Sequence, residues 1–185
     1  MTLPFTYQII RSDRKTVALQ IGAGGQVLVR APRRMTEAQI REFVESKASW
    51  VMGHLAKREQ QAKQPPITME QIHALAAQAV KKIPERVEYY AALIGVRYGT
   101  ITIRNQTSRW GSCTGEGNLN FNCLLMLAPP RVLDYVVVHE LCHRKQMNHS
   151  AAFWAEVEKI MPDYKQLRQW LKDNGGSLIR RMTGR

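Results

Sequence analysis

The first third of the chain alternates between apolar and polar positions in a way that predicts a small β-sheet. Three segments rich in β-branched residues lie between residues 5 and 30, and the glycine-rich stretch 22–25 separates the last two. Short alternating segments joined by tight turns are typical of an antiparallel meander. Pro32 is expected to end the meander, because proline donates no backbone hydrogen bond.

A helical periodicity of apolar residues follows the predicted sheet. From Thr36 the apolar positions recur every three or four residues toward the prolines at 65–66, which predicts an amphipathic helix with Thr36 and Gln39 as a capping box. Thr68 opens a second helix with the same capping pattern. Pro84 lies inside this second helix and should kink or restart it, because proline removes a donor and clashes with the preceding turn.

The second half of the chain predicts two further strands and a series of helices. The segments 100–104 and 119–124 alternate in the manner of strands, with a glycine-containing turn between them. The glycines at 175–176 are expected to end the last helix and to release a basic tail. The helices are expected over residues 131–145, over residues 150–161 and from residue 163 onward.

The composition is that of a globular protein with a basic surface. Apolar residues make up 44% of the 185 positions, which is enough to form a core. The 27 Lys and Arg against 15 Asp and Glu give a formal charge of +12, which favours acidic partners such as nucleic acid. Because the basic residues are spread along the chain with no dominant run, a generally basic, solvated surface is the slightly favoured interpretation.

The sequence predicts a cytoplasmic protein that does not enter a membrane. The first residues lack the basic and apolar regions of a signal peptide, and no stretch is long and apolar enough to cross a bilayer. Cys113, Cys123 and Cys142 show no paired metal-ligand spacing, so we expect them to be reduced thiols.

The sharpest functional signal is the sequence His139-Glu140-Leu141-Cys142-His143. Residues four apart lie on the same face of a helix, so both imidazoles can point at one metal ion. Zinc accepts nitrogen ligands in a tetrahedral shell, and Glu140 can take a proton from zinc-activated water. The alternative is a helix with two unrelated histidines, but the amphipathic helix and a nearby third histidine favour the metal site.

His149 is the expected third ligand, because catalytic zinc usually has three protein ligands and one open position. It lies six residues past His143, too far for an unbroken helix, so the chain must turn between Lys145 and Ser150. Asn148 is a candidate for the bend, since Asn tolerates a left-handed backbone, and Ser150 can cap the next helix. Three good ligands favour an open, catalytic site over a closed, structural one.

Three segments of the sequence resemble a known family. They are SRWGSC at 108–113, LNFNCLLMLAP at 119–129 and YVVVHELCHRKQMNHSAAFW at 135–154. Together they resemble the YgjP-like metallopeptidases, which are small zincins related to the SprT-like and WLM proteases. The likeness extends over nearly the whole chain, from about residue 7 to residue 170.

The resemblance implies an α+β protein with a minimal zincin fold, in which a small twisted sheet packs on helices. It also implies a zinc cofactor at His139, His143 and His149, with Glu140 as the catalytic residue. We expect an N-terminal β-meander and helix over residues 1–64, a zincin-like catalytic core over residues 65–176 and a basic C-terminal tail over residues 177–185. These parts are expected to form one compact unit.

Arg109 and Trp110, in the first of the three segments, are candidates for substrate binding. A strand edge beside the metal-binding helix could bind an extended peptide by backbone pairing, and Arg109 could then anchor a carboxylate or stabilise charge. A packing Trp with an Arg over it is an equally good alternative. Tyr164 and Arg109 are the candidates for stabilising an oxyanion.

The sequence therefore predicts a zinc-dependent metallopeptidase, a hydrolase of peptides or proteins that uses metal-activated water and Glu140 as general base. The alternative is a nucleic-acid-associated zinc protein, in which the zinc is structural or which cleaves proteins bound to DNA. The net charge and the basic C-terminal residues 180–185 favour this alternative.

Overall fold

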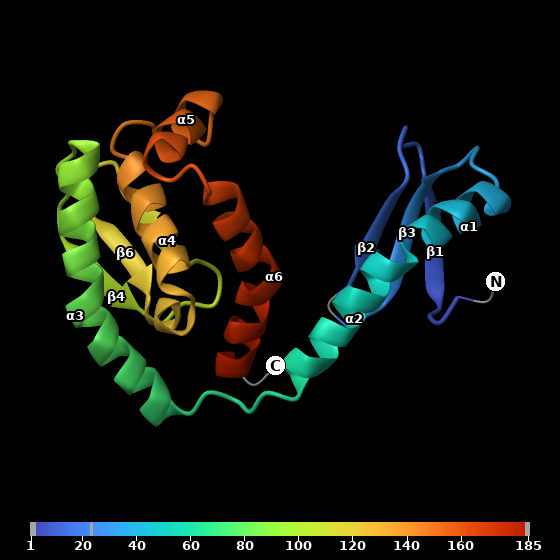
Figure 1. The fold of residues 1–185 in the computed structure, drawn as a ribbon, viewed down its shortest axis with the longest axis horizontal. Coiled ribbons are helices and arrows are strands. Elements are labelled where there is room, and N and C mark those ends of the chain that lie inside the picture. The colour runs from blue at the N-terminus through green and yellow to red at the C-terminus, as the bar shows by residue number, and fades with distance from the viewer. Residues whose placement is uncertain (1–2, 23, 184–185) are drawn as a thin grey trace. The chain divides into compact units, whose positions relative to one another are not determined.

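A computed structural model describes residues 3–22 and 24–183 of the chain and divides it between Gln64 and Pro65. The N-terminal unit comprises residues 1–64, and the C-terminal unit comprises residues 65–185. Each unit has a hydrophobic core of its own. The mixture of helices and small sheets confirms the predicted α+β class (Figure 1).

The sheet of the N-terminal unit is not the predicted antiparallel meander. Its strand order is β1-β3-β2, with β3 parallel to β1 and antiparallel to β2. Burial explains this order, because Val29 and Ala31 of β3 are fully buried whereas β1 is mostly exposed. The most apolar strand therefore takes the centre. The strands are β1 (Tyr7–Ser12), β2 (Ala18–Ile21) and β3 (Val27–Pro32).

Two helices follow this sheet where the sequence predicted one. The capping box of Thr36 and Gln39 is present at the start of α1 (Glu37–Ser46). In the last turn of this helix the Ser46 hydroxyl donates to the Phe43 carbonyl, and such back-bonding slightly destabilises a helix. A second helix, α2 (Ala48–Ala62), then begins without a side-chain cap.

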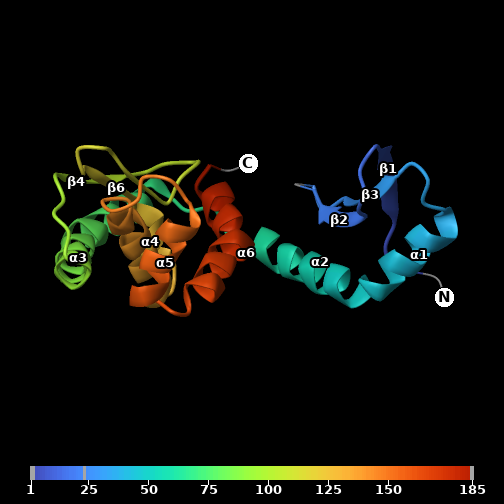
Figure 2. The same cartoon turned by 90° about the horizontal axis from the view of Figure 1, so that it is seen from above.

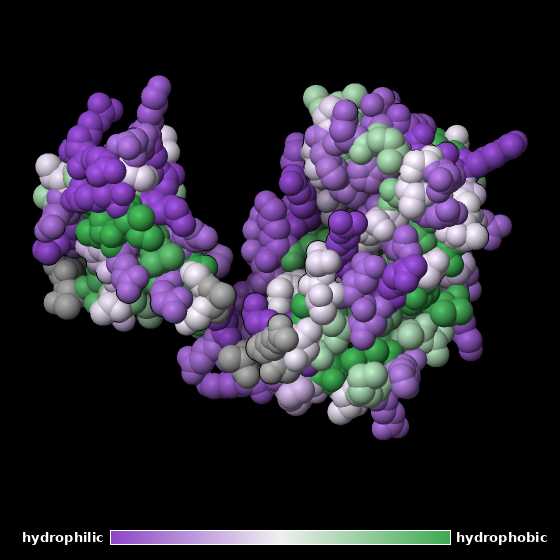
Figure 3. Space-filling view, turned by 180° about the vertical axis from the view of Figure 1, so that it is seen from behind, coloured by the Kyte–Doolittle hydropathy of each residue, from purple (hydrophilic) through white to green (hydrophobic). Residues whose placement is uncertain are grey.

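The surface of the N-terminal unit is uneven in polarity. On the face seen in Figure 3, hydrophobic side chains form a patch that hydrophilic side chains border. Ile9 and Ile10 of the edge strand β1 are both more than a third exposed, at 37% and 38%. Exposed apolar side chains are common on protein surfaces.

The C-terminal unit begins with α3 (Met69–Ile94), which starts at the predicted Thr68 cap. The helix runs through Pro84 as one element, so the expected restart does not occur. Ile83 and Val87 on either side of the proline are fully buried in the same core. Packing of both halves against one core holds the helix together despite the lost backbone donor.

The sheet of this unit has the strand order β4-β6-β5, which makes β5 an edge strand. Strand β6 is parallel to β4 and antiparallel to β5. The sequence missed β5, and it extended β6 to residue 124. The chain instead enters a 3₁₀-helix after Asn122, whose side chain accepts a hydrogen bond from the Leu124 amide. The elements are β4 (Ile101–Arg104), β5 (Gly111–Cys113), β6 (Leu119–Asn122) and η1 (Cys123–Leu127).

Three helices complete the unit, and α4 forms its centre. Residues 132–138 of α4 are all buried, and α3 and α6 flank this helix on one side of the sheet (Figures 1 and 2). Of the helices that the described residues form, none is long and apolar enough to span a lipid bilayer. The helices are α4 (Pro130–Cys142), α5 (Ala151–Ile160) and α6 (Tyr164–Thr183).

Helix α6 continues past the glycines that were expected to end it. Residues 177–183, expected as a tail, form its last turns, with Ser177 and Leu178 buried; residues 184–185 lie outside the described part. Gly175 is required by packing, because a Cβ there would lie 2.9 Å from Cζ2 of Trp110. The glycine therefore admits an indole ring and does not mark a helix end.

An ion pair between Arg86 and Asp134 joins α3 to α4. The guanidinium donates two hydrogen bonds to the carboxylate, of 2.7 and 2.9 Å. The Asp134 side chain is only 10% exposed, so the pair satisfies a charge that would otherwise be buried alone. A second pair, between Arg131 and Asp163, is more exposed on both sides.

These two pairs should differ in their contribution to stability. Arg86→Ala leaves Asp134 buried without a partner and should lower the free energy of unfolding by about 2–3 kcal/mol. Arg131→Ala breaks the exposed pair and should cost less than about 1 kcal/mol. Urea unfolding of both variants checks this, and equal losses would contradict the special role of the buried pair.

Candidate metal centre

Three imidazoles converge at the C-terminal end of α4. His139 lies in the last turn of this helix and His143 is its C-cap residue, so both project from one face. The chain then turns back and brings His149 beside them. One nitrogen atom from each ring lies within 4.8 Å of the other two, and the Nε2 atoms of His139 and His149 are 3.0 Å apart.

The turn that returns His149 uses side-chain hydrogen bonds. Asn148 does not adopt the left-handed backbone that the sequence suggested, since no described residue other than glycine has a positive φ. Its side-chain oxygen instead accepts a hydrogen bond from the Ser150 amide, a local turn that Asn often forms. Ser150 caps α5 as predicted, by accepting from the Phe153 amide.

His139 and His143 are held in the neutral form, which presents a nitrogen lone pair. Burial and the neighbouring rings lower the pKa of His139 to about 3, and burial lowers the pKa of His143, so both are neutral. His143 donates from Nδ1 to the Gln146 carbonyl at 3.1 Å, which leaves its Nε2 as an acceptor. Neutral imidazoles oriented in this way are the form that binds metal ions.

Aromatic side chains fix the orientation of these rings. Phe153 stacks on His143 with ring centroids 4.6 Å apart, and Trp154 stacks on His149 at 5.8 Å. Trp154 also stacks on Tyr164 at 5.2 Å, and Tyr164 is only 6% exposed. Tyr164 therefore lies behind the ring that contacts the histidine cluster.

Glu140 is buried between α4 and the edge strand β5. Its side chain packs against Gly111, because a Cβ at that position would lie 2.6 Å from Oε1 of Glu140. Burial raises the pKa of Glu140 to about 8, and the nearby charge of Arg109 acts in the opposite direction. The site thus has a carboxyl group next to the first histidine and within reach of a guanidinium.

The segment that precedes β5 holds Arg109 and Trp110 in different environments. Arg109 is exposed, and its carbonyl accepts a hydrogen bond from the side chain of Asn122 at 3.0 Å. The Trp110 ring packs against Gly175 of α6. The buried Asn122 side chain also donates to the Gln106 carbonyl. The sequence did not predict this role, since the only signal for Asn122 was its place in the 119–129 segment.

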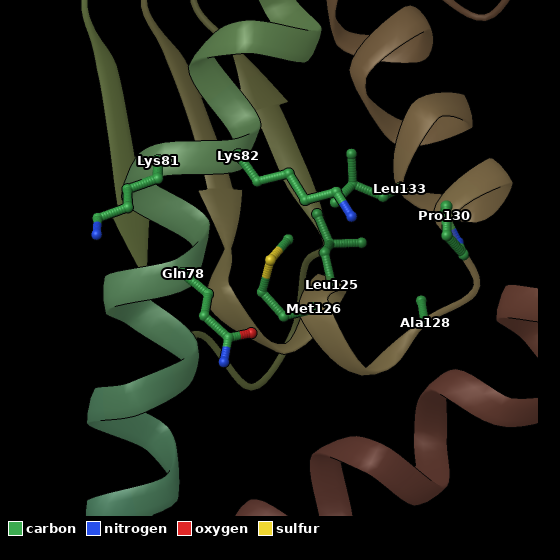
Figure 4. Close-up of a pocket in the computed structure, with 8 residues that line it drawn as sticks. All are labelled: Gln78, Lys81, Lys82, Leu125, Met126, Ala128, Pro130 and Leu133. Atoms are coloured by element: carbon green, nitrogen blue, oxygen red, sulfur yellow. The ribbon is translucent and has the colours of Figure 1, made fainter.

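A separate pocket of about 440 Å³ lies at the other end of α4. Figure 4 shows Lys82 of α3 extending across it toward Leu133. None of its lining residues is His, Cys, Asp or Glu, so it has none of the usual metal ligands. The lining residues are Gln78, Lys81, Lys82, Leu125, Met126, Ala128, Pro130 and Leu133.

A comparison of the sequence with known protein families identifies the family of this chain. The sequence matches the YgjP-like metallopeptidase domain over residues 15–76 and 67–174. The chain belongs to this family. As a YgjP-like protein it is a metallopeptidase, an enzyme of the hydrolase class whose substrates are peptides or proteins.

Solved structures show similarity to part of this YgjP-like chain. The metallopeptidase zymogen of Pyrococcus abyssi abylysin is 23% identical, with a TM-score of 0.44, over 49% of this chain and 93% of its own. The metallopeptidase zymogen of Methanocaldococcus jannaschii jannalysin is 20% identical, with a TM-score of 0.43, over 48% and 92%. None of the curated proteins that were compared matches the chain.

The burial of Glu140 predicts a pH-dependent loss of stability in the metal-free protein. Its pKa is raised from 4.5 to about 8, so folding favours the protonated form, and stability falls as pH rises through this interval. Glu140→Gln removes the ionisation. Its free energy of unfolding should match that of the wild type near pH 4, exceed it increasingly between pH 4.5 and pH 8, by up to about 1.4 kcal/mol per pH unit, and keep a constant excess above pH 8.

Denaturant unfolding of both metal-free proteins between pH 4 and pH 9 measures this difference. Other titrating groups, including His139, are present in both proteins, so their contributions cancel in the difference between the two free energies of unfolding. A difference that stays constant with pH would show that the Glu140 carboxyl is not shifted by burial.

Proposed function

We propose that the chain is a zinc-dependent peptidase in which His139, His143 and His149 hold the metal and Glu140 is the general base. The observation that carries this proposal is the convergence of three imidazole nitrogens within 4.8 Å at one end of α4. The family supports a metallopeptidase, and the donor set supports the choice of zinc.

The donor set fits a catalytic rather than a structural zinc. Three nitrogen ligands are common at catalytic zinc, which keeps a fourth position open. Among the described residues no further His, Cys, Asp or Glu joins the group of three. Within the part of the chain that the structure describes, the buried Nδ1 of His139 has no hydrogen-bond partner, and its Nε2 faces another imidazole nitrogen. With both rings protonated at Nδ1, the two Nε2 lone pairs face each other, and a shared cation would satisfy both.

The proposed chemistry is the hydrolysis of a peptide bond by water. When bound, zinc would polarise the scissile carbonyl, acidify the attacking water and, as a nearby cation, lower the pKa of Glu140 toward the carboxylate form. Glu140 would take the proton from this water and deliver it to the leaving amine. Its burial against β5 keeps the carboxyl out of bulk water.

The edge strand β5 is the proposed binding surface for an extended peptide. Among the strands of residues 3–22 and 24–183, β5 pairs with β6 alone, and peptides bind such edges by adding a strand. Arg109 is exposed and close enough to act on the charge of Glu140. We therefore favour Arg109 over the buried Tyr164 as the residue that contacts substrate or stabilises an oxyanion.

The proposed location is the cytoplasm. Cys113, Cys123 and Cys142 are unpaired in the structure, and unpaired thiols are typical of a reducing compartment. Burial raises the pKa of Cys142 to about 12, which makes it a poor metal ligand compared with the adjacent imidazoles.

Two substitutions separate metal binding from proton transfer. His139→Ala should lose stoichiometric zinc and all peptidase activity, whereas Glu140→Gln should keep zinc and lower kcat by about 100-fold or more. His73→Ala, an exposed histidine on α3, is the control and should change neither. Measurements of zinc content and peptidase activity in all three variants test whether His139 binds the metal and Glu140 transfers the proton. Full activity in Glu140→Gln, or retained zinc in His139→Ala, would contradict the assigned role.

A second candidate function is the cleavage of proteins bound to nucleic acid. It is favoured by a basic cluster in the N-terminal unit, where the loops after β1 and β3 lie side by side. The Arg33 amide donates to the Ser12 carbonyl, and the Arg33 guanidinium pairs with Asp13, the one carboxylate in these two loops. The basic cluster consists of Arg11, Arg14, Lys15, Arg33 and Arg34.

The basic cluster predicts salt-sensitive binding to DNA. With four phosphate contacts, affinity should fall about 100-fold between 50 and 200 mM salt. The double variant Lys15→Glu, Arg34→Glu should weaken binding, and Lys81→Glu, Lys82→Glu in the other unit is the matched control. Fluorescence anisotropy with labelled DNA measures this. No binding at low salt would remove the second candidate and leave the peptidase.

A further inference from the structure

We propose that Gly111 is a positioning residue for Glu140. The absence of a side chain at this point of β5 lets the Glu140 carboxyl lie against the strand. The proposal rests on the role of Glu140 as general base in the proposed function. It assigns to the glycine of the 108–113 segment a task in the reaction, although this residue has no functional group.

Contact distances show that glycine is required here. A Cβ at position 111 would lie 2.6 Å from Oε1, 2.8 Å from Cγ and 3.0 Å from Cδ of Glu140. Real Cβ atoms essentially never make contacts shorter than 3.0 Å. The contact with Cγ is decisive, because relieving it requires rotation about the Cα–Cβ bond of Glu140, whereas a contact with Oε1 alone could be relieved at the tip of the side chain. A methyl group would therefore displace the whole carboxyl.

Backbone conformation does not explain the glycine. The described glycines with positive φ are Gly25, Gly95 and Gly117, so Gly111 has a backbone that any residue can adopt. Glycine also weakens a strand, because it has no side chain to pack. The remaining reason for a glycine at this position is the space that Glu140 occupies.

The strand cannot easily move away from a larger side chain. Gly111 pairs with Phe121 of β6, and Phe121 is only 1% exposed. The Asn122 amide donates to the Trp110 carbonyl at 2.9 Å, and the Asn122 side chain donates to the Arg109 carbonyl at 3.0 Å. These bonds fix the residues directly before Gly111, so the added methyl would move Glu140 rather than β5.

A second glycine, Gly175 of α6, leaves space for the Trp110 ring directly before Gly111. Gly175 lies inside α6, where glycine is unfavourable, and a Cβ there would lie 2.9 Å from Cζ2 and 3.0 Å from Nε1 of Trp110. The Trp110 ring is thus held between its strand and α6. Gly175 thus contacts the Trp110 ring, and the next residue in the chain, Gly111, contacts the Glu140 side chain.

The test compares Gly111→Ala with Gly115→Ala in the zinc-loaded, full-length protein. A Cβ at Gly115 meets no atom within 4 Å, so this variant controls for the loss of a glycine. Because a misplacement of about 1 Å can cost about 100-fold in rate, Gly111→Ala should lower kcat about 100-fold. Its KM should change less than about threefold and its zinc content should stay at wild-type level, and Gly115→Ala should resemble the wild type.

A double variant shows whether Gly111 acts through Glu140. In the Glu140→Gln background, Gly111→Ala should cause no further loss of kcat, because the group that it positions has already been removed. A full additional loss in the double variant would overturn the proposal, and so would wild-type kcat in Gly111→Ala alone.

A crystal structure of Gly111→Ala distinguishes this proposal from the proposed function. The expected result is a displaced Glu140 carboxyl with His139, His143 and His149 in place. A carboxyl in its original position beside a shifted β5 would overturn the positioning role, whether or not the wild type cleaves peptides. Full activity of Glu140→Gln would instead overturn the general base.

Gly175→Ala and its neighbour Gly176→Ala provide a second pair if Gly111→Ala does not fold. A Cβ at Gly176 meets only the end of the Arg180 side chain, at 3.3 Å, so this variant should keep wild-type kcat. Gly175→Ala should displace Trp110 and lower kcat by about tenfold or more with zinc retained. Equal kcat in the two variants would overturn the positioning of this segment by glycine contacts.

Discussion

The structure of the C-terminal unit depends on the burial of α4 between the small sheet and the other helices. A run of seven consecutive buried residues, 132–138, covers every face of this helix, so the helix is enclosed by its neighbours on all sides. Its rotation decides where His139 and His143 point, because both lie on the turns that follow the buried run. A helix that rotated or frayed at this end would separate the two imidazoles.

The third imidazole depends on the short turn after α4 rather than on a regular element. Hydrogen bonds from His143 to the Gln146 carbonyl and from the Ser150 amide to Asn148 shape this turn. Phe153 and Trp154 of α5 then pack on the histidine rings. The turn and the start of α5 therefore act together to orient the ring of residue 149.

The sequence predicted the features that depend on neighbours along the chain. The caps at Thr36, Thr68 and Ser150 are confirmed, as is the helix that carries His139 and His143, because each follows from residues within a few positions. The features it missed depend on distant contacts. From the sequence alone Gly175 predicts the end of a helix, and only its contact with the Trp110 ring explains why the helix continues through it. In the first sheet the central strand is the buried β3, which is not the middle strand in chain order.

The central claim is that three imidazoles bind one zinc ion and leave a position open. X-ray absorption spectroscopy at the zinc edge of the zinc-loaded protein tests it most directly. The account predicts three imidazole nitrogens at about 2.0–2.1 Å, one further light-atom ligand and no sulfur. A sulfur ligand near 2.3 Å, or fewer than three imidazoles, would contradict it.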